Sequence, residues 1–168
     1  MKVRRAEAAD VDFLVELLNH EDVEPYLAAS RARDREAVSA AVERSQAEPE
    51  DAGVFVIELE GEPAGTMEFE RSNRRSRIAR LGGLAVHPDF RGRNLSDEAA
   101  RLFQRHLLHE LGFHRLELEI YGFNDRAMRH AERSGFVREG VKRKAYWRHG
   151  EWVDGVLYGL LAEDLAAE

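Results

Sequence analysis

The sequence predicts a mixed α/β domain with one central sheet, and three observations predict it. Stretches in which apolar and polar residues alternate, typical of strands, are interspersed with stretches of helical spacing. A strong helical pattern separates the apolar stretch ending at Val86 from the alternating stretch that begins at Arg115, and such a crossover makes the two strands parallel. The chain has 168 residues, which is long enough to bury a core as a single domain over residues 1–168. It has no cysteine, so this core forms without disulfides.

A strand and two helices are predicted at the N-terminal end. The opening residues "MKVRR" form a short strand, and Asp10 stands where a helix N-cap belongs. Behind it the apolar residues recur with helical spacing, at Val11, Leu14, Val15, Leu17 and Leu18. Pro25 predicts a loop or short helical turn over residues 21–30, and the composition of Arg31–Gln46 predicts a second helix.

Three strands and a long helix follow. Gly53–Glu60 and residues 64–72 form a hairpin around the turn "GEP". The third strand, Arg77–Val86, ends in "LGGLAV", whose lack of alternation is typical of a strand covered on both faces. The broad apolar side of Asp97–Leu111 then predicts a helix, which Gly112 closes.

The C-terminal third places one more helix between strands. Arg115–Gly122 alternates as a strand, and the helix over Asn124–Ser134 is capped by Asn124 or Asp125 and closed by Gly135. Two further strands are joined by the turn "RHGE", at residues 136–147 and 152–161. The resulting order predicts one sheet flanked by helices.

The net charge of −7 is unevenly distributed. Residues 1–60 hold 7 Lys/Arg and 15 Asp/Glu, whereas residues 61–168 hold 18 and 17. This acidity is typical of solvated helix faces, and it also fits a field that attracts a cationic substrate. The charge excludes the strongly basic class of nucleic-acid proteins. Without a leader sequence or an apolar run of about 20 residues, a cytoplasmic protein with no membrane partner is expected.

The loop "RGRNLS", Arg91–Ser96, lies where a strand gives way to a helix. A helix start presents unpaired backbone N–H groups, and a glycine lets the backbone approach a ligand closely. With the charges of Arg91 and Arg93, these features suit a pyrophosphate. On this segment alone a basic, solvated loop is an equal interpretation, because there is one glycine and no Gly-Lys-Ser/Thr pattern.

Four pieces of the sequence together resemble the GNAT superfamily of acetyl-CoA-dependent N-acetyltransferases. They are "LAVHPDFRG", the helix that ends in "LGF", "LELEIYGFNDRA" and "AERSGFVREG". The closing "KRKAYWRHGEWVDGVLYGLL" is similar to the branch that acetylates ribosomal-protein N-termini and to its polyamine-acetylating relatives. The resemblance implies the acyl-CoA N-acyltransferase fold, a central twisted mixed sheet with splayed parallel strands flanked by helices.

The resemblance also implies a site for acetyl-CoA as cosubstrate. The pantetheine arm would lie in the splay, bonded by the backbone of the strand segment Leu84, Ala85 and Val86. The pyrophosphate would be held by backbone N–H groups of Arg91, Gly92, Arg93, Asn94, Leu95 and Ser96. Asn124 would contact the cofactor near its thiol or pantetheine arm.

Two features depart from the family pattern. Asn94 and Ser96 stand where the family loop has small residues; Asn tolerates left-handed backbone and Ser is small, so the cradle is expected to be kept with weaker geometry. Many relatives carry a tyrosine seven residues after the Asn, placed to protonate the leaving thiolate. Here that position is Ala131, and the adjacent His130 is expected to face elsewhere.

Without that tyrosine, other groups are needed for the chemistry. Glu119, five residues before Asn124, is the candidate base for the amine; the alternative is a solvated strand residue paired with an arginine. Tyr146 and Tyr121 are alternative acids, and each also fits a strand-packing aromatic. A backbone N–H near Leu84 would polarise the thioester carbonyl, and positioning would supply much of the remaining rate.

The sequence therefore favours acetyl transfer to a primary amine by direct attack in a ternary complex, with a protein N-terminus or a small polyamine as acceptor. The alternatives are an acyl-CoA-binding sensor or partner-binding module with little activity, and a scaffold without ligand. No metal is expected, because carboxylates do not back the spacing of His106, His109 and His114. His87 is interpreted as structural. Trp147 and Trp152 fit sheet or dimer packing, so a homodimer is a further expectation.

Overall fold

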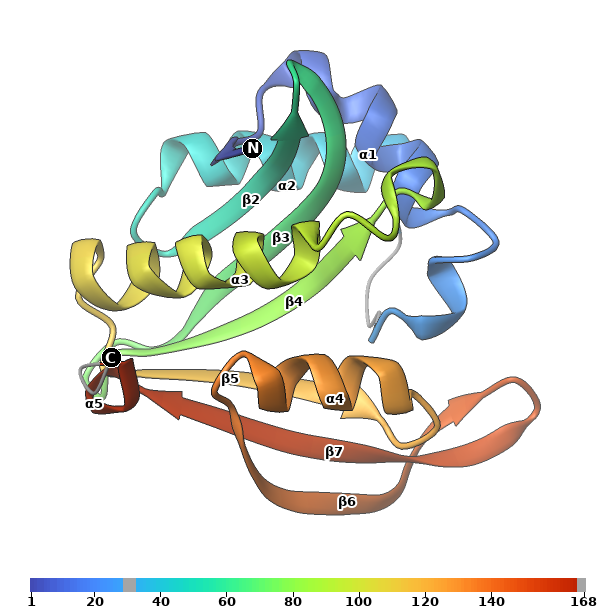
Figure 1. Ribbon diagram of the computed structural model, residues 1–168, viewed down its shortest axis with the longest axis vertical. Helices are drawn as coiled ribbons and strands as arrows, with labels where there is room; N and C mark the ends of the chain where they lie inside the picture. Colours follow the sequence, from blue (N-terminus) through green and yellow to red (C-terminus); the bar gives the residue numbers. More distant parts are fainter. Residues whose placement is uncertain (29–32, 166–168) are drawn as a thin grey trace.

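The computed structural model of the protein describes residues 1–28 and 33–165. Its strands form one sheet of seven in the order β1-β2-β3-β4-β5-β7-β6, shown in Figure 1. Every neighbouring pair is antiparallel except β4 and β5, which are parallel as predicted. The strands are β1 (Lys2–Arg5), β2 (Ala52–Leu59), β3 (Glu62–Asn73), β4 (Ile78–Val86), β5 (Arg115–Tyr121), β6 (Val137–Arg148) and β7 (Glu151–Leu161).

Helices cover both faces of this sheet. One face carries α1 (Val11–Leu18) and α2 (Arg35–Ala47), and the other carries α3 (Leu95–Arg105) and α4 (Asp125–Arg133) (Figure 1). The chain between these elements forms short turns, η1 (Ala8–Asp10), η2 (Glu24–Tyr26) and η3 (Pro88–Phe90), with a π-helical end to α3, η4 (His106–Glu110), and a last turn, α5 (Ala162–Leu165). Among the described residues there is no helix with the length and apolarity needed to cross a bilayer.

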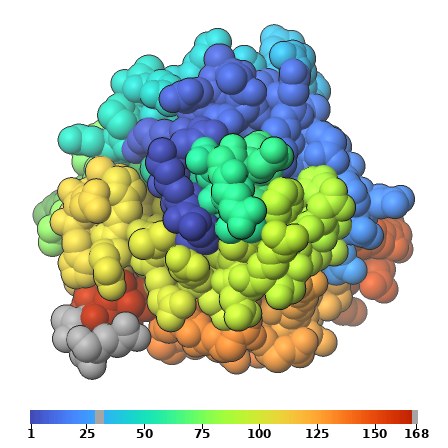
Figure 2. All heavy atoms as spheres, turned by 45° about the horizontal axis from the view of Figure 1, so that its top comes forward, coloured from blue at the N-terminus to red at the C-terminus, as the bar shows by residue number. Residues whose placement is uncertain are grey.

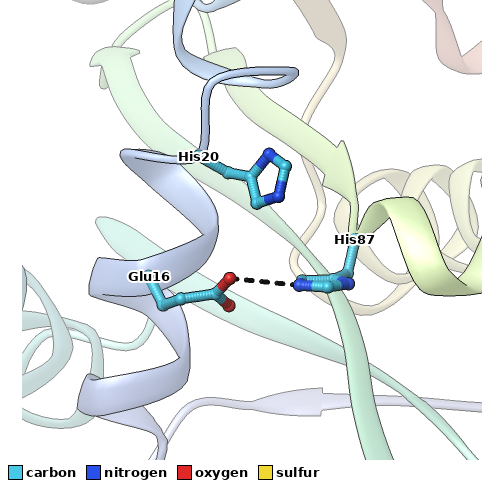
Figure 3. A group of neighbouring side chains, drawn as sticks. All are labelled: Glu16, His20 and His87. Carbon is cyan, nitrogen blue, oxygen red and sulfur yellow. Dashed lines mark hydrogen bonds and ion pairs between the residues drawn. The ribbon is translucent and has the colours of Figure 1, made fainter.

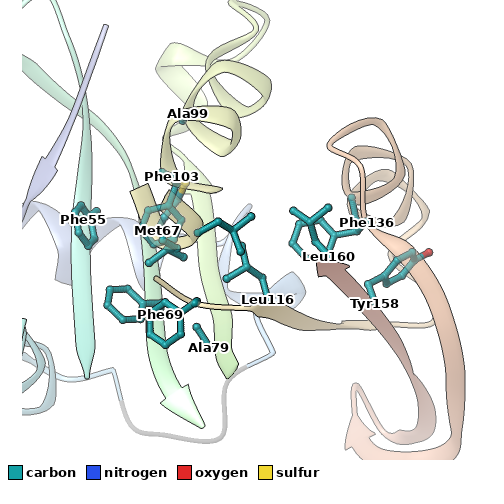
Figure 4. Close-up of a cluster of buried hydrophobic side chains, with 14 of the residues drawn as sticks. Phe55, Met67, Phe69, Ala79, Ala99, Phe103, Leu116, Phe136, Tyr158 and Leu160 are labelled. Atoms are coloured by element: carbon teal, nitrogen blue, oxygen red, sulfur yellow. The ribbon is translucent and has the colours of Figure 1, made fainter. Parts of the chain in front are cut away.

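Two apolar cores, one on each face, hold these layers together. The larger lies beneath α3 and α4, where Phe103 meets Phe55 and Phe69 and where Leu116 of β5 connects the two halves of the sheet (Figure 4). The smaller lies beneath α1 and α2 and includes Val56. Consecutive β2 residues therefore serve opposite cores, which is the two-residue period that identified this strand in the sequence.

The parallel strands β4 and β5 separate soon after they begin. Their pairing ends at Arg80 and Glu117, while β4 stays paired to β3 as far as Val86 and β5 stays paired to β7 as far as Tyr121. A bulge in β4 lies at the point of divergence, where Gly83 has a left-handed φ of 62°. The splay implied by the resemblance is therefore present, and it leaves backbone groups of both strands facing a gap.

Three predictions about the elements need correction. Asp10 precedes α1 but caps no N–H of it, because Arg4 and the backbone N–H of Glu7 take up its carboxylate. The helix predicted from Asp97 begins at Leu95, because the left-handed Asn94 turns the chain two residues earlier. The predicted helix Arg31–Gln46 begins at Arg35, and residues 31 and 32 lie outside the described residues.

The end of β4 also differs from the prediction. "LGGLAV" is not covered on both faces: of these residues only Ala85 is buried, and Gly82 is exposed. The physical reason is the divergence from β5, which removes the neighbour on one edge and leaves this part of the strand along a pocket.

The buried carboxylate of Asp10 provides a test of what anchors the N-terminal strand. Arg4 donates two hydrogen bonds to it, at 2.8 and 3.0 Å, and these bonds are the main cause that lowers the pKa of Asp10 below its ordinary value of 3.8. Asp10→Asn is expected to reduce the free energy of unfolding by about 2 kcal/mol near pH 7. The carboxylate stabilises the fold above its unfolded pKa, and this stabilisation is lost as the pH falls through its lowered folded pKa. The difference in the free energy of unfolding between wild type and variant should therefore become smaller in acid.

Urea unfolding at several pH values measures this difference. The control is Asp12→Asn, since Asp12 also pairs with an arginine but is exposed, and its loss should stay within about 0.5 kcal/mol. Equal losses in the two variants would show that burial of Asp10 adds nothing.

Candidate functional site

The gap between β4 and β5 opens into a pocket of about 1400 Å³. Its walls include the second half of β4, the end of β5, the start of α3, the start of α4 and the end of β6, and the pocket extends to residues of α1, α2, β2 and β3. All the residues predicted for the cofactor and for catalysis border this pocket. They are Leu84, Ala85, Val86, Arg91, Gly92, Arg93, Asn94, Leu95, Ser96, Glu119, Asn124 and Tyr146.

The predicted pyrophosphate loop forms the entry to α3. Gly92 and Asn94 both have positive φ, 79° and 56°, so the left-handed backbone expected of Asn94 is present. Within the described chain, no hydrogen bond is made by the backbone N–H groups of Leu95, Ser96 and Asp97. The helix start therefore presents free donors with the positive end of its dipole.

The two arginines of this loop are exposed and differ in their contacts. Arg91 donates to the carbonyl of Asp22 at 3.0 Å, which ties the loop to the segment after α1. The guanidinium of Arg93 lies 5.6 Å from the ring centroid of Phe90. Both cations are thus fixed beside the free N–H groups, where an anionic ligand would meet them.

Asn124 lies across the gap, at the C-terminal end of β5. Its Oδ1 accepts a hydrogen bond from the N–H of Ala127 at 3.2 Å, which confirms it as the N-cap of α4. Since the cap uses the oxygen, the Nδ2 group is the part of this side chain left for a ligand. Asn124 and the loop Arg91–Ser96 therefore line the same pocket.

Helix α4 carries no acid at the position where relatives have tyrosine. Ala131 there is 3 % exposed and belongs to the larger core. The adjacent His130 faces α3 instead, with Nδ1 2.8 Å from Asp97 Oδ1, and burial lowers the pKa of His130 despite that carboxylate. Figure 2 shows the resulting neighbourhood on the surface, where α4 (orange) lies against the residues that lead into α3 (lime green).

The two predicted catalytic side chains meet each other. Tyr146 Oη donates a hydrogen bond of 2.7 Å to Glu119 Oε1, and only 15 % of the Glu119 side chain is exposed. Burial, followed by the bond to Glu119, raises the pKa of Tyr146 to about 12. The phenol therefore keeps its proton at neutral pH, and the carboxylate is held in one place.

A glycine beneath this pair makes the contact possible. A Cβ at Gly155 of β7 would lie 2.3 Å from Glu119 Oε1 and 2.7 Å from Tyr146 Cε2. The cation beside Glu119 is Lys142, at 3.4 Å, and not the arginine of the alternative interpretation. Sequence reasoning missed Lys142, because only the pairing of β6 with β7 brings it there.

Tyr121, the other candidate acid, is a packing residue in this structure. It is 5 % exposed, its ring stacks on Phe123 at 5.5 Å, and the guanidinium of Arg148 lies 5.4 Å from its centroid. Arg148 in turn pairs with Glu24 at 3.2 Å. On this side of the pocket, the acidic first third of the chain is thus partly neutralised by arginines.

Three possible metal ligands gather on the α1 face, where the sequence predicted no metal (Figure 3). Glu16, His20 and His87 have ligand atoms within 4.8 Å of one another, and Glu16 Oε1 lies 3.2 Å from His87 Nε2. Both imidazoles accept a backbone hydrogen bond at Nδ1, from Asp22 and Asp89. This bonding places the proton of each neutral ring on Nε2, so a metal there would require the other tautomer. The absence of a metal stays a prediction.

Comparison with known families and curated proteins finds similarity to acetyltransferases. The family described as "Acetyltransferase (GNAT) domain" matches residues 1–137. The chain is 31% identical to the SPbeta prophage-derived uncharacterized N-acetyltransferase YokL of Bacillus subtilis over 81 residues. The aligned residues cover 48% of this chain and 46% of that protein. It is 25% identical over 114 residues to the spermidine N(1)-acetyltransferase of Escherichia coli, covering 68% and 61%. The matches thus span about half of these relatives' length.

Solved structures show the same fold. Spermidine N-acetyltransferase from Vibrio cholerae, in complex with CoA and spermine, superposes with a TM-score of 0.88 over 98% of this chain and 97% of that chain, at 18% identity. A structure titled probable acetyltransferase gives 0.81 over 96% and 93%, at 23% identity. At these identities the likeness establishes the arrangement of strands and helices.

The Tyr146–Glu119 bond generates a prediction for the phenol itself. Glu119→Gln removes the negative charge but leaves the burial, which is the larger cause of the shift. The pKa of Tyr146 should therefore fall from about 12 yet stay above its ordinary 10.0. Tyrosinate absorbance followed against pH in the wild type and the variant measures this. In Glu117→Gln, which changes a carboxylate that pairs with Arg115 on the same strand, the Tyr146 titration should stay as in the wild type.

Proposed function

We propose that this chain, which belongs to the acetyltransferase (GNAT) domain family, transfers the acetyl group of acetyl-CoA to a primary amine. The observation that carries the proposal is the separation of β4 from β5 after Arg80 and Glu117, with a free helix start on one side of the gap and the Glu119–Tyr146 pair on the other. A ligand with a pyrophosphate and a long, amide-bearing arm fits this arrangement.

The residues of the pocket suit acetyl-CoA as the cosubstrate, which supplies an activated acetyl group. The N–H groups at the start of α3, with Arg91 and Arg93, are the proposed holders of the pyrophosphate. Backbone groups of Leu84–Val86 face the gap and are the proposed partners of the arm's amides. Asn124 is the proposed contact near the thiol, through the nitrogen that its cap leaves over.

Catalysis is proposed to rest on position and on Glu119. The acceptor amine must lose a proton as it attacks the acetyl carbon, and Glu119 is the proposed base. Tyr146 donates a hydrogen bond that orients this carboxylate. It is also the proposed acid for the leaving thiolate, because its phenol keeps its proton at neutral pH. The backbone N–H near Leu84 is the proposed donor to the carbonyl oxygen. Direct attack in a ternary complex needs no covalent intermediate on the protein.

The acceptor is proposed to be a small polyamine-type amine. The names of two relatives, which describe spermidine acetyltransferases, support this class, and the acidic first third of the chain fits a cation. A protein N-terminal amine is the alternative acceptor. A second function, an acyl-CoA sensor with little turnover, is favoured by Ala131 at the usual position of the acid and by the lysine already bound to Glu119.

Charge reversal in the loop tests where CoA binds. Arg91→Glu places a negative charge beside the proposed pyrophosphate site and should weaken CoA binding at least about tenfold, as measured by calorimetry. Arg75→Glu makes the same charge change in the exposed turn after β3 and should leave the affinity within about twofold. Unchanged affinity in Arg91→Glu would mean that the pyrophosphate lies elsewhere.

Replacing the base tests the chemistry. Glu119→Gln keeps the shape of the side chain and should lower kcat/KM for an amine acceptor by roughly 10- to 1000-fold near neutral pH. The loss should shrink at high pH, where the acceptor is already a neutral amine. Thiol release measured over an amine panel that includes spermidine gives the readout, with Glu117→Gln as the control. Full activity of Glu119→Gln across the pH range would make Glu119 a structural strand residue.

A further inference from the structure

The chain presents one of its own primary amines to Glu119. Lys142 Nζ lies 3.4 Å from Glu119 Oε1 and 3.5 Å from Oε2, so its ammonium group bridges both oxygens of the carboxylate. About half of the Lys142 side chain is exposed, whereas the carboxylate is largely buried. The lysine therefore approaches the proposed base from the solvent side.

An irregularity in β6 produces this contact. Lys142 and Tyr146 are four residues apart on β6, yet their partners on β7, Gly155 and Val153, are only two apart. In a regular strand, residues four apart lie about 13 Å from each other and do not reach one carboxylate. The two extra residues bulge outward and bring both side chains to Glu119, and bulges beside active sites commonly redirect side chains in this way.

The bulge is held in a defined shape. Lys144, at its centre, has a positive φ of 49°, and its backbone N–H donates to Asp154 Oδ1 at 2.8 Å. Gly155 contributes the space in which Glu119 meets Tyr146. The backbone of the bulge that carries Lys142 is therefore held by a specific hydrogen bond between the two strands.

From this geometry we infer that Lys142 is a site of self-acetylation. The inference rests on the proposed acetyl transfer. The Lys142 ammonium gives one proton to Glu119, and the lone pair so freed forms a bond to the acetyl carbon as the thioester C–S bond breaks. The sulfur leaves with the bonding electron pair and takes up the second Nζ proton, so that acetyl-CoA and the amine become CoA and N-acetylated Lys142. The product amide is neutral and releases Glu119 from its ion pair.

The small number of lysines in the chain allows acetylation to be followed at each one separately. The protein has three lysines, at 2, 142 and 144, and Lys144 is the internal control: in the described part of the chain its side chain makes no hydrogen bond or ion pair. The folded wild-type chain is incubated with acetyl-CoA, and acetylation at each lysine is followed by peptide mass spectrometry. A heat-denatured sample gives the non-enzymatic background.

Lys142 should be acetylated at least about tenfold faster than Lys144 in the folded chain, and not in the denatured one. Glu119→Gln should reduce Lys142 to the rate of Lys144. Lys142→Arg should abolish the fast label without transferring it to Lys144. Circular dichroism confirms that both variants remain folded. Equal rates at the two lysines in the wild type, or an unchanged fast label in Glu119→Gln, would overturn the inference.

A parallel assay separates this inference from the function on which it rests. Thiol release is measured with spermidine as an external acceptor under the same conditions. If spermidine is acetylated and Lys142 is not, self-acetylation is wrong and the proposed function stands. If neither Lys142, spermidine nor any other amine of the panel is acetylated, both are wrong.

Discussion

The structure depends on the early separation of the two parallel strands, each of which stays paired with its outer neighbour. β4 is held to β3, and β5 to β7, over almost their whole length, whereas the pairing of β4 with β5 extends over three residue pairs. Backbone N–H and C=O groups that lose a partner must find another or face solvent. The divergence, set at the Gly83 bulge, therefore creates a line of unused backbone groups along each wall of the gap. The pocket, the start of α3 and the cap of α4 are arranged around it.

Three carboxylates in or beside the pocket are paired with other side chains. Glu119 has Tyr146 and Lys142, Asp97 has His130 and Arg133, and Glu24 has Arg148. Such pairs fix side chains in position at a modest net free energy, because desolvation offsets most of the attraction. An acceptor amine that reaches Glu119, the proposed base, would therefore compete with Lys142 for this carboxylate.

Local patterns predicted most of the fold, and long-range register decided the rest. Periodicity, composition and turn residues located the strands and the main helices, and the crossover before Arg115 predicted the parallel pair. The Asp10 cap was wrong because Arg4, a neighbour on the adjacent strand, competes for its carboxylate. The structure places the residues predicted from the family resemblance around one pocket, and their roles stay predictions; Lys142 was missed. Its contact arises from an extra pair of residues in β6, and a sequence pattern does not reveal which residues of a strand are extra.

The glycines of β7 have a consequence for the comparison of related sequences. Gly155 lies beneath Glu119 and Tyr146, and a Cβ at Gly159 would lie 2.5 Å from Glu139 Oε1 and 2.6 Å from Arg115 Nη1. The two positions are four residues apart and face the same side of the sheet, one on each side of Leu157, and each leaves room for a polar pair above it. In a homologue with alanine or a larger residue at either position, the pair above it would have to shift. The spacing Gly-x-x-x-Gly in this strand is therefore a marker by which chains with the same polar arrangement can be sorted from those that only share the fold.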